Sequence, residues 1–205
     1  MSDLPVALPS GLEPAFLAAF DPPGKLVAAL ESLGPVADRD VVVVDATAGP
    51  ILSGLTALGG RLRSIPLAAT AKAAPGRLEA EDGSADAVIG LWSAFRGVSP
   101  AEIADVDRVL RPGGRHLVVH DYGRDDVSRL HGDRLEYGTW SHRNGPFLTG
   151  GFRVRVVHCF WEFESGEAAT GFLTAAFGET GASVAATLKR PRLAYNVAVY
   201  HRSRP

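Results

Sequence analysis

The chain has 205 residues, 46% of them hydrophobic and 21% charged, values that exclude a disordered, fibrous or coiled-coil protein and predict one globular domain with embellishments. Lys and Arg (21) nearly balance Asp and Glu (23), so the chain lacks the positive field that holds a phosphate backbone, and we expect no nucleic-acid partner. The single cysteine, Cys159, excludes an internal disulfide and is compatible with a reducing compartment.

The amino-terminal residues and the apolar runs bear on localisation. The first twenty residues contain no cation and three prolines, unlike the charged-then-apolar order of a secretory signal. The longest apolar runs, such as residues 41–44, are far shorter than the roughly 20 residues that cross a bilayer. We therefore expect a cytoplasmic protein with no membrane partner. The sequence leaves both a monomer and a homodimer open.

The first 36 residues form a predicted helical segment. Ser10 and Glu13 have the spacing of a capping box, and apolar residues recur at helical spacing until residues 21–24 (DPPG) end the pattern. A second amphipathic pattern runs over residues 26–33 and ends at a Gly-Pro pair.

Four consecutive valines, residues 41–44, begin the main sheet. A β-branched run without polar alternation is typical of a strand buried on both faces, as in the middle of a parallel sheet. Strands and helices then alternate as a parallel sheet requires: a helix at 50–58, strands at 61–65 and 86–92, a helix from Pro100 to the Pro-Gly-Gly at 112–114, and a strand at 115–121. Ser99 and Glu102 predict a capping box for the second helix.

The remaining chain is rich in β-type residues. Residues 152–163 and 193–201 read as two long strands, with a Gly- and Ala-rich helix over about 166–188 between them. The pattern predicts an α/β fold in which residues 41–44, 86–92 and 115–121 are adjacent parallel strands. Residues 193–201 close the sheet as an antiparallel strand.

The turn after the valine strand, residues 45–50 (DATAGP), is the first candidate site. Ligands of doubly wound sheets bind beyond the carboxyl ends of the strands, where the strand order reverses. Gly49 allows a tight turn, and Pro50 starts a helix whose amide end can receive an anion such as a carboxylate. A turn without any ligand explains both residues equally well.

Three blocks of the sequence resemble the class I S-adenosylmethionine-dependent methyltransferases. They are residues 41–45 (VVVVD), residues 81–88 (EDGSADAV), and residues 102–119, in which LRPGG at 110–114 links a helix to a strand. The last two blocks are the specific part, and residues 150–152 (GGF) with the strands after them are similar to the end of that fold. The resemblance implies a single methyltransferase-like domain with a Rossmann-like sheet of about seven strands, the last antiparallel.

The resemblance also implies a cofactor, S-adenosylmethionine, a core at residues 41–121 that binds it, and a substrate side at residues 122–205. Methyl transfer to a small molecule is the implied activity. The implied cofactor-binding residues follow or flank the strands: Asp45, Ala46, Thr47, Gly49, Ser64, Asp82, Trp92 and Ser93.

The chain departs from the family pattern at three places. The glycine positions of the first loop hold Thr47, Gly49 and Ile51, so the loop is degenerate. The second strand ends in residues 64–67 (SIPL), without the acidic residue that would bind the ribose hydroxyls. Residues 66–85 are too few for a full helix, strand and loop, so the third strand is shortened or missing. Either substitutes such as Ser64, Glu79, Glu81 or Trp92 hold the cofactor, or binding has weakened or been lost.

Catalytic candidates lie near strand ends and in one loop. His120, with Asp121 to orient it, could accept a proton from a hydroxyl or thiol acceptor. The alternative is that one of the pair caps a loop and the other faces solvent. His142, with Trp140, Tyr137 and Arg143, could form a lid over an acceptor, or simply belong to a packed surface loop.

Other histidines and the cysteine indicate no further chemistry. His158 lies in a strand pattern typical of the core, and Cys159 reads as a small buried hydrophobe. The six histidines are scattered without metal-ligand spacing, so no metal is expected.

Three functions compete at this point. The first is a methyltransferase, and the second is a methyltransferase-like binding module that does not catalyse, which the lost glycines favour. The third is a nicotinamide-dinucleotide enzyme in which Arg61 and Arg63 face a ribose phosphate. The missing GxGxxG after the first strand argues strongly against the third.

Overall fold

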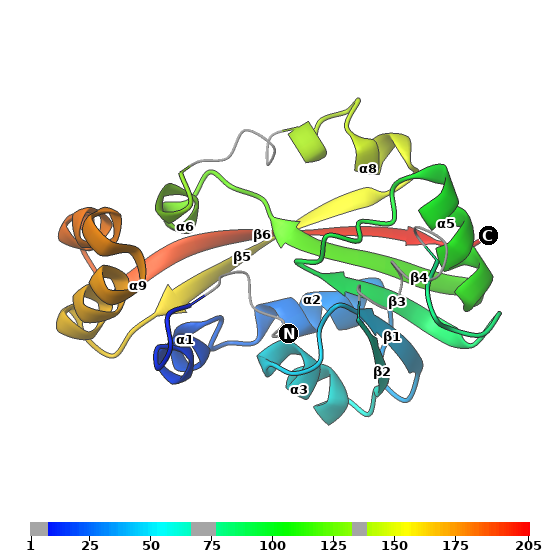
Figure 1. Ribbon diagram of the computed structural model, residues 1–205, viewed down its shortest axis with the longest axis horizontal. Helices are drawn as coiled ribbons and strands as arrows, with labels where there is room; N and C mark the ends of the chain where they lie inside the picture. The colour runs from blue at the N-terminus through cyan, green and yellow to red at the C-terminus, as the bar shows by residue number, and fades with distance from the viewer. Residues whose placement is uncertain (1–7, 67–76, 133–138) are drawn as a thin grey trace.

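A computed structural model describes residues 8–66, 77–132 and 139–205. Its strands form one mixed sheet in the order β2-β1-β3-β4-β6-β5 (Figure 1). The strands are β1 (Asp40–Val44), β2 (Arg61–Ile65), β3 (Ala85–Leu91), β4 (Leu110–Asp121), β5 (Arg153–Glu162) and β6 (Arg192–Ser203). The predicted Rossmann-like α/β fold is therefore confirmed, with six strands among the described residues instead of about seven. Residues 67–76, where a shortened third strand was expected, lie outside the described residues.

The parallel half of the sheet follows the sequence prediction. Val42 pairs with Arg63 of β2 on one side and with Val88 of β3 on the other, and β3 in turn pairs with β4 in parallel. The four valines of β1 are at most 3% exposed, as expected for a strand covered on both faces. Strand order reverses at β1, which makes its carboxyl end the switch point of the sheet.

The other half is antiparallel. β6 runs antiparallel to β4 and β5, which confirms its predicted direction, but it lies between them, so β5 is the strand at this edge of the sheet. The start of β4 is irregular, because Leu110 pairs with Ala85 while the next paired residue, Arg115, is opposite Ala87. The helix before it ends at Val109, three residues before the Pro-Gly-Gly expected to stop it, since those residues form this bulged strand start.

The helices cover both faces of the sheet. α1, α2 and α3 lie along one face, and α5 and α8 lie along the other (Figure 1). Their bounds are α1 (Glu13–Ala19), α2 (Lys25–Leu33), α3 (Pro50–Ala57), α5 (Pro100–Val109), α6 (Asp126–Leu130), α8 (Pro146–Thr149) and α9 (Gly166–Thr187). The largest hydrophobic core lies between the sheet and the α1–α3 layer and continues into α9.

Two helix predictions need correction. The Ser10 capping box does not form, because α1 has Leu12 at its N-cap and no side-chain cap. α9 is not one straight helix, because Gly178 has φ 59° and breaks it into two segments. These segments pack closely, since a Cβ on Gly181 would lie 1.9 Å from the carbonyl oxygen of Leu173. Among the described residues, no helix combines the length and apolar character needed to span a membrane.

Candidate functional site

The strand register brings most of the candidate residues to one edge of the sheet. Val44 at the end of β1 pairs with Ile65 and Gly90, and Leu91 pairs with Val119, so four parallel strands end together. The residues at or just beyond this carboxyl edge are Asp45, Ala46, Thr47, Gly49, Ser64, Trp92, Ser93, His120 and Asp121. Asp82 is not among them, because it precedes β3 at the opposite edge and forms an ion pair with Arg108 at 2.6 Å.

The loop after β1 turns on two residues with positive φ. Asp45 has φ 66° and donates its amide to the carbonyl of Ile65 at 2.8 Å, which fixes the loop to β2. Gly49 has φ 143° and ψ 175°, a conformation that side-chain-bearing residues rarely adopt. α3 then begins at Pro50, and its N-cap residue, Gly49, provides no side-chain cap.

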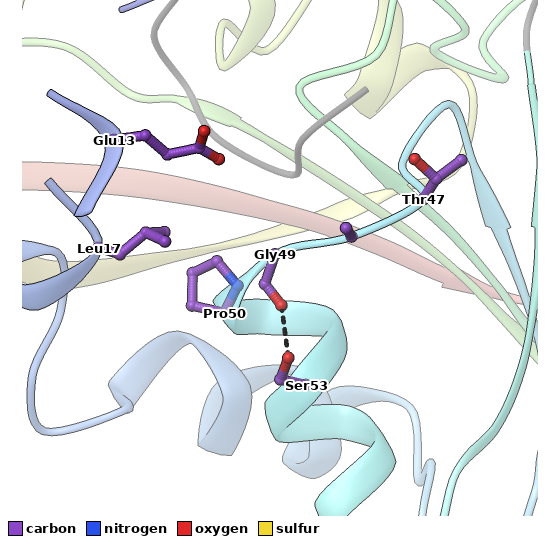
Figure 2. Close-up of a pocket in the computed structure, with 7 residues that line it drawn as sticks. Glu13, Leu17, Thr47, Gly49, Pro50 and Ser53 are labelled. Atoms are coloured by element: carbon purple, nitrogen blue, oxygen red, sulfur yellow. Dashed lines mark hydrogen bonds between the residues drawn. The ribbon is translucent and has the colours of Figure 1, made fainter. Parts of the chain in front are cut away.

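A pocket of about 550 Å³ opens beside this loop (Figure 2). It is lined by Glu13, Leu17, Thr47, Ala48, Gly49, Pro50 and Ser53. Glu13 and Leu17 come from α1 and lie across from the turn at Gly49 and Pro50 (Figure 2). Among the described lining residues only Glu13 is charged, so the wall combines one carboxylate with an uncapped helix start.

The two faces of α1 explain why Glu13 and Leu17 reach the pocket. Phe16 and Phe20 are buried. The centroid of the Phe16 ring lies 4.9 Å from that of Trp161, and the centroid of the Phe20 ring lies 6.2 Å from that of Trp92. Glu13 and Leu17 lie beside this buried face and outside the core: Glu13 is exposed, and Leu17 is 37% exposed. Sequence reasoning assigned Glu13 only to a helix cap and missed this role. The available signal was an acidic and an apolar residue spaced i, i+4, which places their side chains next to each other on a helix.

The residues that follow β3 are bonded within the protein. Trp92 has φ 46° and donates its indole Nε1–H to Oδ1 of Asp121 at 2.9 Å. Ser93 is 3% exposed, and its hydroxyl accepts the amide of Phe95 at 3.0 Å. Neither side chain lines the pocket beside the first loop.

Asp121 is the centre of a polar cluster at the end of β4. Its Oδ1 accepts hydrogen bonds from Trp92 and from the hydroxyl of Tyr195, and its Oδ2 lies 3.7 Å from Nδ1 of His131. Burial raises the pKa of Tyr195 well above its usual value and the Asp121 carboxylate raises it further, so the tyrosine remains a donor. Tyr195 and His131 were missed in the sequence, because they come from β6 and from the residue after α6.

His120 and Asp121 do not form the pair proposed from the sequence. Consecutive strand residues point to opposite faces of a sheet. The His120 ring lies 4.9 Å from the Trp140 ring, whereas Asp121 bonds to Trp92 and Tyr195 on the other face. Burial, and then the charge of Arg96, lowers the pKa of His120 to about 4, so its ring is neutral at neutral pH.

The loop proposed as a lid is described in part. Trp140 is buried and stacks under the guanidinium of Arg96 at 4.0 Å, while His142 and Arg143 are exposed. Tyr137 lies outside the described residues. His142 is thus the catalytic candidate that the structure leaves accessible.

The second strand carries no carboxylate at its end. Ser64 is half-buried and Pro66 is exposed, and neither lines the pocket. Ile51 is 2% exposed in the main core, so its side chain does not occupy the pocket either. The other proposed substitutes, Glu79 and Glu81, are exposed and do not line it.

The remaining sequence hypotheses can be placed as well. Arg61 forms an ion pair with Asp40 at 2.6 Å at the opposite edge of the sheet. Cys159 is buried as predicted, at 1% exposure. The interpretation of His158 as a core residue is wrong, because it lies on the exposed face of β5 and contacts Asn196 at 2.7 Å. In the part of the chain that the structure describes, no cluster of three metal-ligand side chains occurs.

Comparison with solved structures identifies methyltransferases. A provisionally named type II methyltransferase from Anaeromyxobacter dehalogenans is 18% identical with a TM-score of 0.54, over 87% of this chain and 94% of that chain. A provisionally named methyltransferase from an antibiotic biosynthesis pathway of Anabaena variabilis is 13% identical with a TM-score of 0.52, over 85% of this chain and 95% of that chain. No protein-family model matches the sequence, and no curated protein matches it. The resemblance to class I S-adenosylmethionine-dependent methyltransferases is therefore confirmed at the level of the fold.

Proposed function

We propose that the protein transfers a methyl group from S-adenosylmethionine to a small molecule. The observation that carries this proposal is the pocket of about 550 Å³ beside the first loop, at the switch point of a methyltransferase fold. The cofactor supplies a methyl carbon already activated by its sulfonium, so the protein mainly has to bind and orient. A cytoplasmic setting belongs to the same proposal, because Cys159 is a buried free thiol.

The pocket offers one partner for a negative group and one for a positive group of the methionine part. The uncapped start of α3 suits the carboxylate, because its amide groups and dipole favour an anion. The Glu13 carboxylate suits a cationic group, either the ammonium or the sulfonium. The backbone at Gly49 allows close approach, and Leu17 offers an apolar contact.

The ribose side fits less well. Ser64 and Pro66 provide no carboxylate, so at least one charge-assisted hydrogen bond is missing unless another acidic side chain replaces it. The loss of one such bond weakens binding about ten- to a hundredfold. We therefore expect weak affinity for the cofactor.

The acceptor side is assigned to residues 122–205. His142 is exposed in the loop before α8 and is the group we assign to the acceptor. His120 and Asp121 hold the end of β4 through packing and hydrogen bonds, and we assign them to the support of the site.

A binding module that does not catalyse is the second candidate. It is favoured by a specific observation, namely that both His120 and Asp121 are engaged inside the protein. The two candidates differ in turnover: the methyltransferase labels a component of a small-molecule extract when given methyl-labelled cofactor, and the module does not.

Calorimetric titration with S-adenosylmethionine and with its demethylated product tests the proposal. We expect saturable binding of both, and abolition of both by Gly49→Val, since φ 143° and a close ligand leave no room for the side chain. Gly171→Val is the matched control, because Gly171 is exposed on α9 with nothing within 4 Å. No heat with either ligand at millimolar concentration contradicts the proposal.

Glu13→Gln tests the charge in the pocket without straining the backbone. We expect weaker binding of the cofactor, with a larger loss for the sulfonium form than for the product, whose thioether sulfur is neutral, if Glu13 faces the sulfur. Glu167→Gln is the control, because Glu167 is also an exposed acid in the first turn of a helix, α9. Equal affinities in the two variants contradict the assignment of Glu13.

A further inference from the structure

A second pocket, of about 260 Å³, lies at the opposite edge of the sheet from the first loop. It is formed at the beginnings of β4 and β5 and at the end of β6, near the C-terminus marked in Figure 1. Its described lining residues are Arg115, Gly151, Arg153, His201, Arg202 and Ser203. It shares no residue with the pocket beside the first loop.

The strand register concentrates positive charge on one face of this edge. Arg115 is opposite Ser203, and Arg153 is opposite His201. Because alternate strand residues share a face, Arg155 lies on the same face as Arg153. Arg115 on β4 and Arg153 on β5 flank the end of β6 from its two sides, whereas the whole chain carries a net charge of −2. The cluster is therefore a local excess of positive charge in an otherwise acidic protein.

Carboxylates do not neutralise the cluster. Arg202 is paired, since Asp107 accepts from it at 2.8 and 3.3 Å. Within residues 8–66, 77–132 and 139–205, no carboxylate forms an ion pair with Arg115 or Arg153. Arg115 donates to the hydroxyl of Ser203, which holds its guanidinium at the pocket wall.

The pKa of His201 is sensitive to the charges of the neighbouring arginines. Its pKa is lowered by burial first, and then by the charges of Arg153, Arg115 and Arg155. The imidazole is therefore neutral at neutral pH, and the arginines alone supply the charge of the pocket. An anion placed among them would offset their repulsion and make protonation of His201 easier.

We propose that this pocket binds a phosphate group, either as free phosphate or as a small phosphate monoester. Arginine guanidinium groups match phosphate oxygens with paired, charge-assisted hydrogen bonds. None of the described lining residues carries a carboxylate side chain that would repel a dianion. A long nucleic-acid chain is disfavoured, because the net negative charge of the protein opposes a polyanion.

The test is a titration with inorganic phosphate at constant ionic strength, followed by calorimetry and by NMR of the histidine rings. We expect saturable binding and an upward shift of the His201 pKa compared with chloride. Arg153→Gln should weaken phosphate binding about tenfold or more, and Arg115→Gln is a second variant. Both should leave binding of S-adenosylmethionine unchanged, which makes this test independent of the proposed function.

The control variant is Arg190→Gln, in another basic pocket that also contains Lys189 and Arg192. Equal weakening by Arg190→Gln and Arg153→Gln means non-specific charge attraction and overturns the proposal. A linear response without saturation, or an unchanged His201 pKa, also overturns it. A parallel titration with phenyl phosphate distinguishes the two ligands. If phenyl phosphate binds more tightly than inorganic phosphate, the ligand is a phosphate monoester; if it binds equally or more weakly, the ligand is free phosphate.

Discussion

Two regions of the carboxyl edge satisfy their polar groups in different ways. In the first loop, α3 starts without a side-chain cap beside an open pocket. At the ends of β3 and β4, Trp92 and Tyr195 both donate to Asp121, and the next helix, α5, has a reciprocal capping box between Ser99 and Glu102. The ends of β3 and β4 therefore hold the fold together, whereas the open pocket beside the first loop agrees with the ligand site proposed there. Changes in the two regions should therefore affect different properties.

The largest expected effect is the loss of stability in acid caused by buried histidines of β4. Burial lowers the pKa of His116 to about 3 and that of His120 to about 4, from 6.5. As the pH falls below 6.5, the unfolded chain takes up these protons before the folded chain does. The free energy of unfolding should then fall by up to about 1.4 kcal/mol per pH unit for each histidine.

Urea unfolding across this pH range measures the effect. His116→Leu and His120→Leu should each flatten the dependence, whereas the exposed His142→Gln should leave it unchanged. If neither His116→Leu nor His120→Leu changes how steeply the free energy of unfolding depends on pH, the end of β4 is not a closed region.

The next effect concerns Asp121. Asp121→Ala should lower the free energy of unfolding by about 2–4 kcal/mol, because Trp92 and the buried Tyr195 both lose their acceptor. Asp82→Ala is the control and should cost at most about 1 kcal/mol, since the Asp82 side chain is 78% exposed in its ion pair with Arg108. If chemical denaturation showed the same decrease in the free energy of unfolding for Asp121→Ala and Asp82→Ala, the role assigned to Asp121 would be contradicted.

A smaller effect is expected at the start of α5. Ser99→Ala removes the hydroxyl that accepts the amide of Glu102 at 3.2 Å and should cost about 1 kcal/mol. The affinity for S-adenosylmethionine should not change, because α5 starts away from the first pocket. If Ser99→Ala changed the affinity for S-adenosylmethionine but not the melting curve, the start of α5 would belong to the binding site and not to the part that stabilises the fold.

The smallest effect on stability is expected in the pocket itself. Leu17→Ala should change the free energy of unfolding by no more than about 0.5 kcal/mol, because Leu17 is already 37% exposed. It should nevertheless weaken cofactor binding about fivefold through lost apolar contact. Leu58→Ala, at the similarly exposed Leu58 (39%), is the control that should affect neither property. Identical calorimetric affinities for the two variants would exclude α1 from the site.

Local patterns predicted the elements that depend on neighbouring residues. The valine run gave the central strand, and Ser99 with Glu102 gave the start of α5, because burial on two faces and helix capping leave short-range signals. Adjacent parallel strands then followed from the alternation of strands and helices. Gly178 was missed as a helix break, because an isolated glycine in an Ala-rich run is also compatible with a continuous helix.

The candidate site was predicted only in part. The first loop and the strand ends could be located, but the partners of their side chains could not, because those partners are distant in sequence. Tyr195 reaches Asp121 across 74 positions, and Glu13 reaches the pocket because the packing of Phe16 and Phe20 in the core holds α1 beside the first loop. The exposed side of β5 at His158 likewise depends on which face of the sheet the helices cover.

We propose that the first loop binds the ligand while the ends of β3 and β4 stay closed. Amide and indole NMR spectra recorded during addition of S-adenosylmethionine test it directly. We predict that the resonances of Leu17, Thr47, Gly49 and Ser53 shift, whereas the indole of Trp140 does not. Shifts confined to Trp140 and His142, or no shift at millimolar cofactor, would contradict the claim.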